Sequence, residues 1–84
     1  MISRTNKFNK VFKKIPLKIQ ERALERLGLL LEDEFNPLLN NHELNGEYEG
    51  CRSINVNSDW RIIYEKQKGG IHLLQIGTHS QLYE

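Results

Sequence analysis

Two side chains suited to RNA chemistry lie four positions apart near the carboxyl end of the chain. His79 and Tyr83 follow an apolar, strand-like run, within the segment Gly77-Thr78-His79-Ser80-Gln81-Leu82-Tyr83-Glu84. Histidine is the side chain best suited to proton transfer near neutral pH, and a tyrosine ring can stack on a base. We therefore interpret this segment as one wall of an active site, with His79 as a general acid. The alternatives are a histidine hydrogen-bonded at a strand end and a tyrosine that simply packs.

Three further candidates lie upstream. His42 occupies a long polar loop, where it is either a base, a phosphate contact or merely exposed. Asp59 follows turn-forming residues and either orients a histidine or bonds its own backbone as a turn aspartate. Arg61 is one residue past Trp60 on a predicted strand, where a guanidinium can bind a phosphate with paired donors or form a cross-strand ion pair. Arg52 is a weaker phosphate candidate, because alternation places it with the apolar side of its strand.

Composition limits the classes of protein to consider. With 84 residues the chain is long enough for one small domain, 1–84. It has no apolar run near the roughly 18–20 residues that span a bilayer and no apolar leader segment, so we expect a cytoplasmic protein without a membrane partner. The single cysteine, Cys51, excludes an internal disulfide. No Cys/His spacing resembles a zinc site, so no metal or cofactor is predicted.

The net charge of +1 conceals an uneven distribution. Residues 1–26 carry eight Lys and Arg against two Glu, whereas residues 27–50 carry six acidic residues and no Lys or Arg. A basic stripe along the first helices could contact phosphates, and we assign that role to Lys10, Lys14 and Lys18. The alternative is a solvated helix face.

The spacing of apolar residues predicts two helices followed by a sheet. Residues 8–15 and the stretch after Pro16 have helical periodicity, and the apolar positions of the second helix are Ile19, Ala23, Leu24, Leu27, Leu30 and Leu31. Residues 51–56, 60–64 and 71–76 read as strands joined by short turns, which indicates an antiparallel meander. Residue Ile2 could begin another strand, but its neighbours give it little apolar support. Trp60 and Tyr64 are predicted to be core residues.

The order of these motifs resembles the RelE/ParE toxin superfamily of toxin–antitoxin modules, and within it the YafQ-like mRNA interferases. The resemblance rests on the helix-Pro-helix order and on His42-x-Leu44-x-Gly46, Gly50-x-Arg52-Ser53-Ile54-x-Val56, Asp59-Trp60-Arg61-x-x-Tyr64 and Gly77-Thr78-His79-Ser80-x-Leu82-Tyr83. It implies an α+β fold, the compact RelE-like microbial RNase fold, in which an N-terminal helical hairpin packs on one face of an antiparallel sheet of three to four strands.

The resemblance also implies an activity and partners. Such toxins cleave mRNA in the ribosomal A site without metal, and a cognate antitoxin holds them inactive. His79, His42, Asp59 and Tyr83 match functional positions of the family, and we place Arg61 with them as a catalytic residue. We expect the antitoxin to cover the groove between the exposed face of the sheet and the C-terminal strand end.

Two departures from the family pattern leave other functions open. Asn55 stands where these toxins often carry a histidine, and Ser53 where an acid can stand. Neither side chain exchanges protons near pH 7, so a degenerate, non-catalytic antitoxin-binding homologue is one alternative. A ParE-like gyrase poison is the other, although His79 argues against it.

Overall fold

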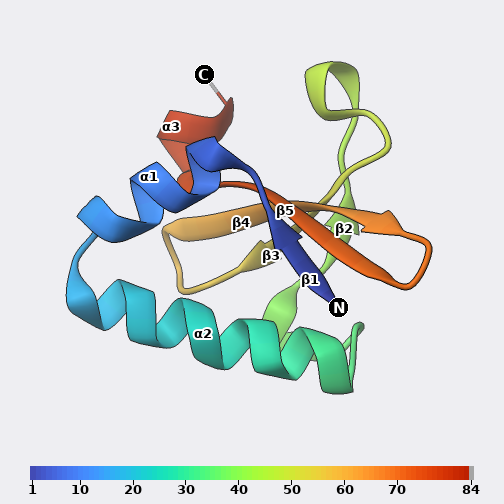
Figure 1. Cartoon of the computed structure of the whole chain (residues 1–84), viewed down its shortest axis with the longest axis horizontal. Coiled ribbons are helices and arrows are strands. Elements are labelled where there is room, and N and C mark those ends of the chain that lie inside the picture. Colours follow the sequence, from blue (N-terminus) through green and yellow to red (C-terminus); the bar gives the residue numbers. More distant parts are fainter. Residues whose placement is uncertain (84) are drawn as a thin grey trace.

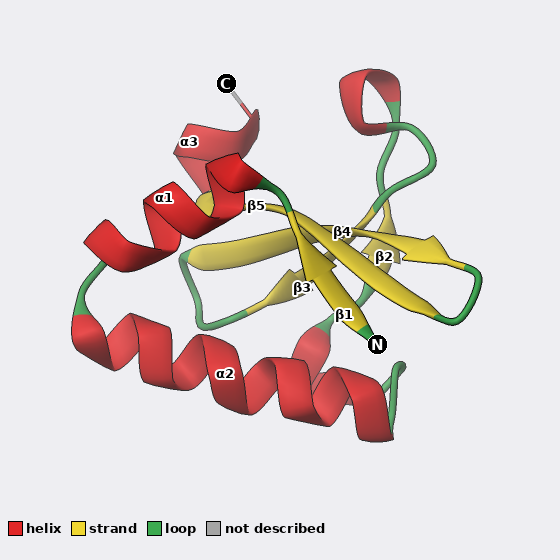
Figure 2. Cartoon of the chain, viewed as in Figure 1, coloured by secondary structure: helices red, strands yellow, loops and turns green. Residues whose placement is uncertain are grey.

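The computed structural model describes residues 1–83, in which two helices cover one face of a five-stranded sheet and a short third helix lies on the other (Figures 1 and 2). The elements in chain order are β1 (Ile2–Arg4), α1 (Asn6–Lys14), α2 (Leu17–Glu32), the 3₁₀ helix η1 (Pro37–Leu39), β2 (His42–Glu43), the 3₁₀ helix η2 (Gly46–Tyr48), β3 (Arg52–Asn55), β4 (Trp60–Gln67), β5 (Gly70–Thr78) and α3 (His79–Tyr83). Among residues 1–83, none of the helices has the length and apolar content needed to cross a bilayer.

The sheet confirms the predicted α+β architecture but differs from the prediction in its edges. Its strand order is β1-β5-β4-β3-β2, so the expected antiparallel meander β3-β4-β5 forms the centre. The two-residue strand β2 extends it antiparallel to β3, and β1 extends it parallel to β5. The sheet is therefore mixed and has five strands rather than three to four.

Strand β1 forms although its sequence is mostly polar. Ile2 pairs with Ile71, and the Ile71 N–H donates to the Met1 carbonyl at 3.0 Å. Ser3 and Arg4 are exposed. The strand is held by backbone pairing, by the half-buried Ile2 and by the contact of the Ser3 hydroxyl with His72 Nδ1 at 2.6 Å. Alternating apolar residues, the usual signal of a strand, are absent from an edge strand of this length.

Thr5 joins this edge strand to the first helix. Its hydroxyl accepts from the Phe8 N–H at 3.0 Å and so caps α1, and it also donates to the Leu74 carbonyl at 2.8 Å. The Thr5 N–H donates to the neighbouring Leu73 carbonyl at 3.0 Å. Threonine is among the preferred N-cap residues; here the same side chain also fixes α1 against β5.

Helix α2 buries fewer apolar residues against the core than its sequence predicts. Ala23, Leu27 and Leu30 are buried at the spacing of one helix face, whereas Leu24 and Leu31 are 61% and 58% exposed. Of the six apolar positions of this helix, these two leucines therefore do not face the core. They line a hollow of about 410 Å³ between α1, α2 and β1.

Each face of the sheet has its own apolar cluster. The larger cluster lies under α1 and α2 and contains Phe8, Leu27, Ile54, Ile62 and Tyr64 among others. The smaller cluster, on the opposite face, is formed by Cys51, Ile63 and Leu82, with Leu44, Tyr48, Leu74 and Tyr83 packed against it. Trp60 and Tyr64 belong to the larger cluster, as predicted.

A polar network ties the C-terminal end of α2 to the sheet. The Tyr64 hydroxyl donates to Glu34 at 3.1 Å and accepts from Asn41 at 2.8 Å, while the Lys66 ammonium contacts Glu34 at 3.0 Å. Burial by itself raises the pKa of the Glu34 carboxyl, but the hydrogen bonds from Lys66 and Tyr64 outweigh it, so this pKa is lowered. Glu34 is therefore ionised in the native protein and stabilises it.

The dual role of Thr5 gives a stability prediction. Thr5→Val keeps the shape but loses the cap and the bond to Leu74, so we expect the free energy of unfolding to fall by about 1–2 kcal/mol. Urea denaturation followed by circular dichroism measures it. Thr5→Ser, which keeps the hydroxyl, is the matched control; equal losses in both variants would refute this role.

The lowered pKa of Glu34 predicts an acid-sensitive contribution to stability. Because this pKa lies below its unfolded value of 4.5, the contribution is complete above that pH and is lost as the pH falls through the folded value. Glu34→Gln should lower the free energy of unfolding at pH 7 by up to about 1 kcal/mol, with a smaller effect near pH 3. Urea titrations at both pH values test this. An unchanged difference between variant and wild type at the two pH values contradicts it.

Candidate active site

Two rows of side chains cross the sheet face opposite α1 and α2. Strand register places Ser53 beside His42 on one side and Ile63 on the other, and Ile63 pairs with Gln75. Directly paired residues of an antiparallel ladder project to the same face, so these four share a row. The neighbouring row contains Asn55, Arg61 and Gly77.

Helix α3 folds back over this face directly after β5. The Thr78 N–H donates to Gln81 Oε1 at 2.8 Å, and the Gln81 N–H donates to Thr78 Oγ1 at 3.2 Å. This reciprocal pair is a capping box, and the sequence carries its signature as Thr78-x-x-Gln81. A side chain at Gly77 would press on Gln81 and Leu82, so glycine permits the close turn.

The capped helix places His79 and Tyr83 side by side on the sheet face opposite α1 and α2, which we call the site face. Their ring centroids are 4.8 Å apart at an interplanar angle of 57°. The Tyr83 hydroxyl donates to Ser53 Oγ at 2.9 Å, and Ser53 is fully buried. His79 remains exposed. Its imidazole therefore stands against an anchored aromatic ring and is open to a ligand.

Asp59 and Arg61 reach this end of the sheet from the β3–β4 turn. The His79 N–H donates to the Asp59 carbonyl at 2.9 Å, and the Asp59 side chain is exposed. The turn aspartate role falls instead to Asn57, whose Oδ1 accepts from the Asp59 and Trp60 N–H groups. The Asp59 carboxylate thus remains available to a ligand or to a histidine.

The Arg61 guanidinium is already partly engaged. Its Nη1 donates to the Asn57 and Trp60 carbonyls at 2.9 and 3.1 Å, and its Nη2 donates to the Ser58 carbonyl at 3.1 Å. A guanidinium has five N–H donors, so two remain for a phosphate. Arg61 lies on the opposite face from Ile62 and Tyr64, as strand alternation predicts.

His42 is at the edge of the same face. Its Nδ1 lies 2.9 Å from the Asn40 carbonyl, and since a carbonyl only accepts, Nδ1 carries the hydrogen. The neutral ring then presents Nε2 as an acceptor. The paired position of Ser53 brings His42 to the row on which Tyr83 is anchored. Asn55, in the next row, has a buried Oδ1 that accepts no hydrogen bond within residues 1–83.

Arg52 lies apart from these groups. It pairs with Tyr64 on the helix-covered face, donates from Nε to Asn41 Oδ1 at 2.8 Å and from Nη1 to Glu43 at 3.3 Å, and stacks over Phe35. These contacts occupy the guanidinium in the polar network of the sheet edge. The structure does not bring it together with His79 and Tyr83.

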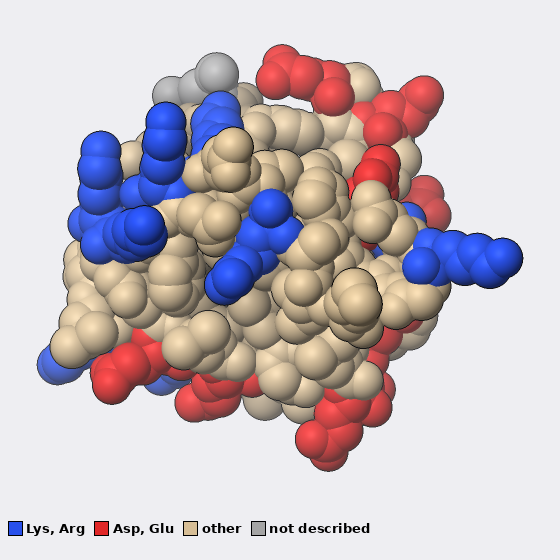
Figure 3. Space-filling model, viewed as in Figure 1, with Lys and Arg blue, Asp and Glu red and all other residues tan. Residues whose placement is uncertain are grey.

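The predicted basic stripe is exposed on the helices. Lys10 and Lys14 project from α1, and Lys18 lies in the first turn of α2. Figure 3 shows Lys and Arg side chains gathered over the α1 side of the molecule, with Asp and Glu along the right and lower edges. α1 packs on β5, the strand from which α3 emerges. The stripe is thus available to a long polyanion.

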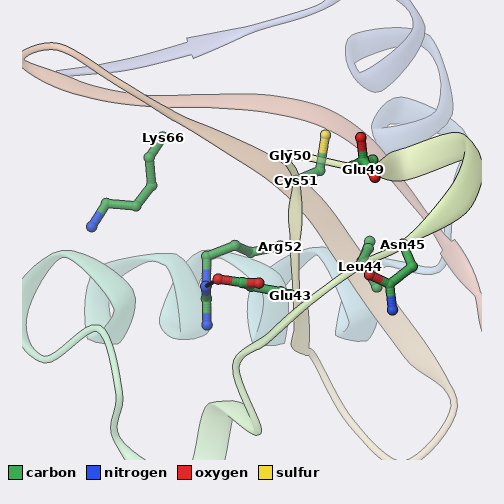
Figure 4. A pocket seen from close by; sticks show the side chains of 8 residues that line it. All are labelled: Glu43, Leu44, Asn45, Glu49, Gly50, Cys51, Arg52 and Lys66. Carbon is green, nitrogen blue, oxygen red and sulfur yellow. Dashed lines mark hydrogen bonds and ion pairs between the residues drawn. The ribbon is translucent and has the colours of Figure 1, made fainter.

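A cavity of about 390 Å³ at the β2–β3 edge is a weaker candidate (Figure 4). Its cations are neutralised: Arg52 pairs with Glu43, and Lys66 pairs with Glu34 outside the lining. Burial, followed by the charge of Glu65, raises the pKa of the Cys51 thiol, which opposes a nucleophilic role. Within residues 1–83, His, Cys, Asp and Glu nowhere gather in groups that could hold a metal ion.

A second, smaller cleft lies beside Tyr83, the residue whose ring contacts His79. It measures about 300 Å³ and is lined by Asn45, Glu47, Tyr48, Leu82 and Tyr83. The rings of Tyr48 and Tyr83 meet edge-on at 6.3 Å. Periodicity offers no means of placing Tyr48, a loop residue, against a C-terminal helix.

Comparison with known proteins gives one consistent family. A family model described as the bacterial toxin of the type II toxin–antitoxin system, YafQ, matches residues 1–84. The crystal structure of Escherichia coli YafQ is similar with a TM-score of 0.76 and 24% identity, covering 100% of this chain and 98% of that one. No curated protein sequence matches the chain.

Two complexes contain similar chains. A chain of the E. coli DinJ–YafQ toxin–antitoxin complex has a TM-score of 0.73 and 25% identity, with 100% of this chain and 97% of that chain covered. A chain of the YoeB–YefM complex from Staphylococcus aureus has a TM-score of 0.80 and 16% identity, with coverage of 94% and 95%. The fold of the present chain is thus that of these toxin structures.

The three carbonyl contacts of Arg61 predict a structural role besides any phosphate contact. Arg61→Lys removes the planar fork, so we expect the free energy of unfolding to fall by about 1–2 kcal/mol. Urea denaturation measures the loss, and Arg22→Lys, at an exposed position of α2, is the control that should stay within about 0.5 kcal/mol. Equal stability of the two variants would show that the turn does not depend on Arg61.

Proposed function

The chain belongs to the family of YafQ toxins of bacterial type II toxin–antitoxin systems, and we propose that it is a metal-independent endoribonuclease that cleaves mRNA in the ribosomal A site. The contact that supports this most directly is the His79 imidazole against the anchored Tyr83 ring, at 4.8 Å. It combines an exposed proton-transfer group with an aromatic surface for a nucleotide.

The proposed reaction assigns one step to each group. Neutral His42 takes the proton of the ribose 2′-OH through Nε2, and the 2′-oxygen attacks the phosphorus. The bond from phosphorus to the 5′-oxygen breaks as protonated His79 transfers its proton to that oxygen. The products are a 2′,3′-cyclic phosphate and a free 5′-OH, so protons and charge balance.

In this proposal, Arg61 stabilises the negative charge on the phosphate. Its two remaining N–H donors face an anion that gains charge during the attack, and preorganised donors of this kind are effective because they need no rearrangement. The exposed Asp59 carboxylate, whose backbone is bonded to His79, would orient that imidazole. The lysines of α1 and α2 would add sequence-independent contacts to RNA phosphates.

A cognate antitoxin is the second proposed partner. Toxins similar in fold include chains solved with the antitoxins DinJ and YefM. We propose that the antitoxin of this chain covers the site face between α3 and the η2 loop, where it would block His79 and Tyr83. The cleft of about 300 Å³ between those two elements lies within the surface that the antitoxin would cover.

The nuclease proposal predicts a large effect at one histidine. His79→Ala should lower the rate of mRNA cleavage by at least about 100-fold, since general acid catalysis contributes that much or more. The measurement is mapping of new mRNA 5′ ends in a translating extract supplied with the purified chain. His72→Ala is the matched control, because His72 lies on β5 and contacts Ser3 at the β1 edge.

The same experiment distinguishes the other functions. Cleavage by wild type that persists in His79→Ala would refute the assigned role of His79. Intact transcripts with broken DNA in cells expressing the chain would indicate a gyrase poison, and growth without either effect would indicate a non-catalytic homologue. Assays on ribosome-free mRNA and on translated mRNA then separate a free ribonuclease from a ribosome-dependent one.

A further inference from the structure

Two tyrosines of the site face are fixed to the sheet by their hydroxyl groups. The Tyr83 hydroxyl donates to Ser53 Oγ, and Gln75 Nε2 donates to the Tyr48 hydroxyl, both at 2.9 Å. Ser53 is in β3 and Gln75 in β5, and both pair with Ile63 of β4. One row of the sheet therefore anchors both rings, although one belongs to the η2 loop and the other to α3.

The anchoring determines how the rings stand. Because the phenol oxygens point to the sheet, the planar parts of both rings rise from it, at an interplanar angle of 89°. Both side chains are only partly buried, so ring surface remains available to a ligand. An aromatic ring held at both its Cβ and its hydroxyl loses little further freedom on binding, which favours affinity.

The cleft that these two rings line suits a neutral ring more than a phosphate. Leu82 and the two tyrosines give it apolar walls, and the polar lining residues are Asn45 and Glu47. Lys and Arg are absent from this lining, and the exposed Glu47 carboxylate repels anions. Its volume of about 300 Å³ is at the lower end of pockets that hold small ligands, roughly 300–1,000 Å³.

We propose that this cleft binds an unpaired RNA base next to the cleaved phosphate, with Tyr48 as a base contact and Ser53 and Gln75 as positioning residues. The proposal rests on the proposed ribonuclease function. Tyr83 is part of both the cleft and the proposed catalytic site, because it lines the cleft and its ring contacts His79. A base in the cleft would thus hold its own phosphate beside the imidazole.

The polar lining selects among the bases. A carboxylate only accepts hydrogen bonds, so Glu47 favours bases with an exocyclic amino group, namely guanine, adenine and cytosine. Uracil has no exocyclic amino group, and its single base-pairing N–H lies between two carbonyl oxygens, which the carboxylate repels. We therefore expect cleavage sites to be depleted of uracil at the nucleotide that occupies the cleft.

Kinetics on translated mRNA test the two tyrosine contacts. Tyr48→Leu removes the ring and keeps apolar volume, and should raise KM about tenfold or more, the effect of losing one stacked base, with little change in kcat. Tyr48→Phe and Gln75→Leu each break one end of the same hydrogen bond. Their effects on KM should be smaller, similar and non-additive in the double variant.

Ser53→Ala and Tyr83→Phe form the equivalent pair, and should also be non-additive. Tyr64→Phe is the matched control: its hydroxyl is bonded on the helix-covered face, to Glu34 and Asn41, so it should lower stability without changing KM. Glu47→Gln should raise the fraction of uracil at the mapped sites. Circular dichroism verifies that each variant folds.

The outcomes separate this proposal from the nuclease assignment. If Tyr48→Leu cleaves with an unchanged KM and base composition, while His79→Ala does not cleave, the cleft proposal is wrong and the nuclease stands. If wild type cleaves no RNA, the nuclease proposal fails. The cleft is then tested with a short RNA carrying 2-aminopurine, whose fluorescence should be quenched by wild type and not by Tyr48→Leu; no quenching by wild type overturns the cleft as well.

Discussion

A single β-bulge in β5 determines which side chains reach the site face. Ile63 pairs with Gln75 and the next residue, Tyr64, pairs with Leu73, so Leu74 is an extra residue in the ladder. One extra residue reverses the alternation of faces beyond it. Leu73 and Ile76 therefore both pack under the helices, and Leu74 and Gln75 both belong to the opposite side. Without the bulge, Gln75 and Gly77 would turn toward the core.

The bulge is held in place by Thr5, which follows the edge strand β1 beside β5. Thr5 bonds the carbonyls of Leu73 and Leu74 with its N–H and its hydroxyl, and the same hydroxyl caps α1. Strand β1, the first helix and the irregular point of β5 thus share one residue. This connection explains why a three-residue polar strand is part of the fold: it places Thr5 at the position where the ladder changes register.

Sequence patterns predicted the elements whose signals are local. The helices α1 and α2, the strands β3 to β5 and the burial of Tyr64 follow from periodicity in continuous segments. Periodicity failed where a partner distant in sequence decides the outcome, as for β1 beside β5. It also overestimated the buried stripe of α2, because the position of α1 and β1 leaves Leu24 and Leu31 uncovered. The capping box that begins α3 is, by contrast, a local signal that the sequence carries.

The same distinction between local signals and contacts distant in sequence applies to the candidate site. Residue types and motif order alone indicated proton transfer and aromatic contact at His79 and Tyr83, because those chemistries belong to the side chains themselves. The partners of these groups depend on register and on chain reversal. The bond from Tyr83 to Ser53 and the contact between the rings of Tyr48 and Tyr83 both join residues far apart in the chain. Such contacts are set by how strands pair and where α3 folds back, which no stretch of sequence encodes separately.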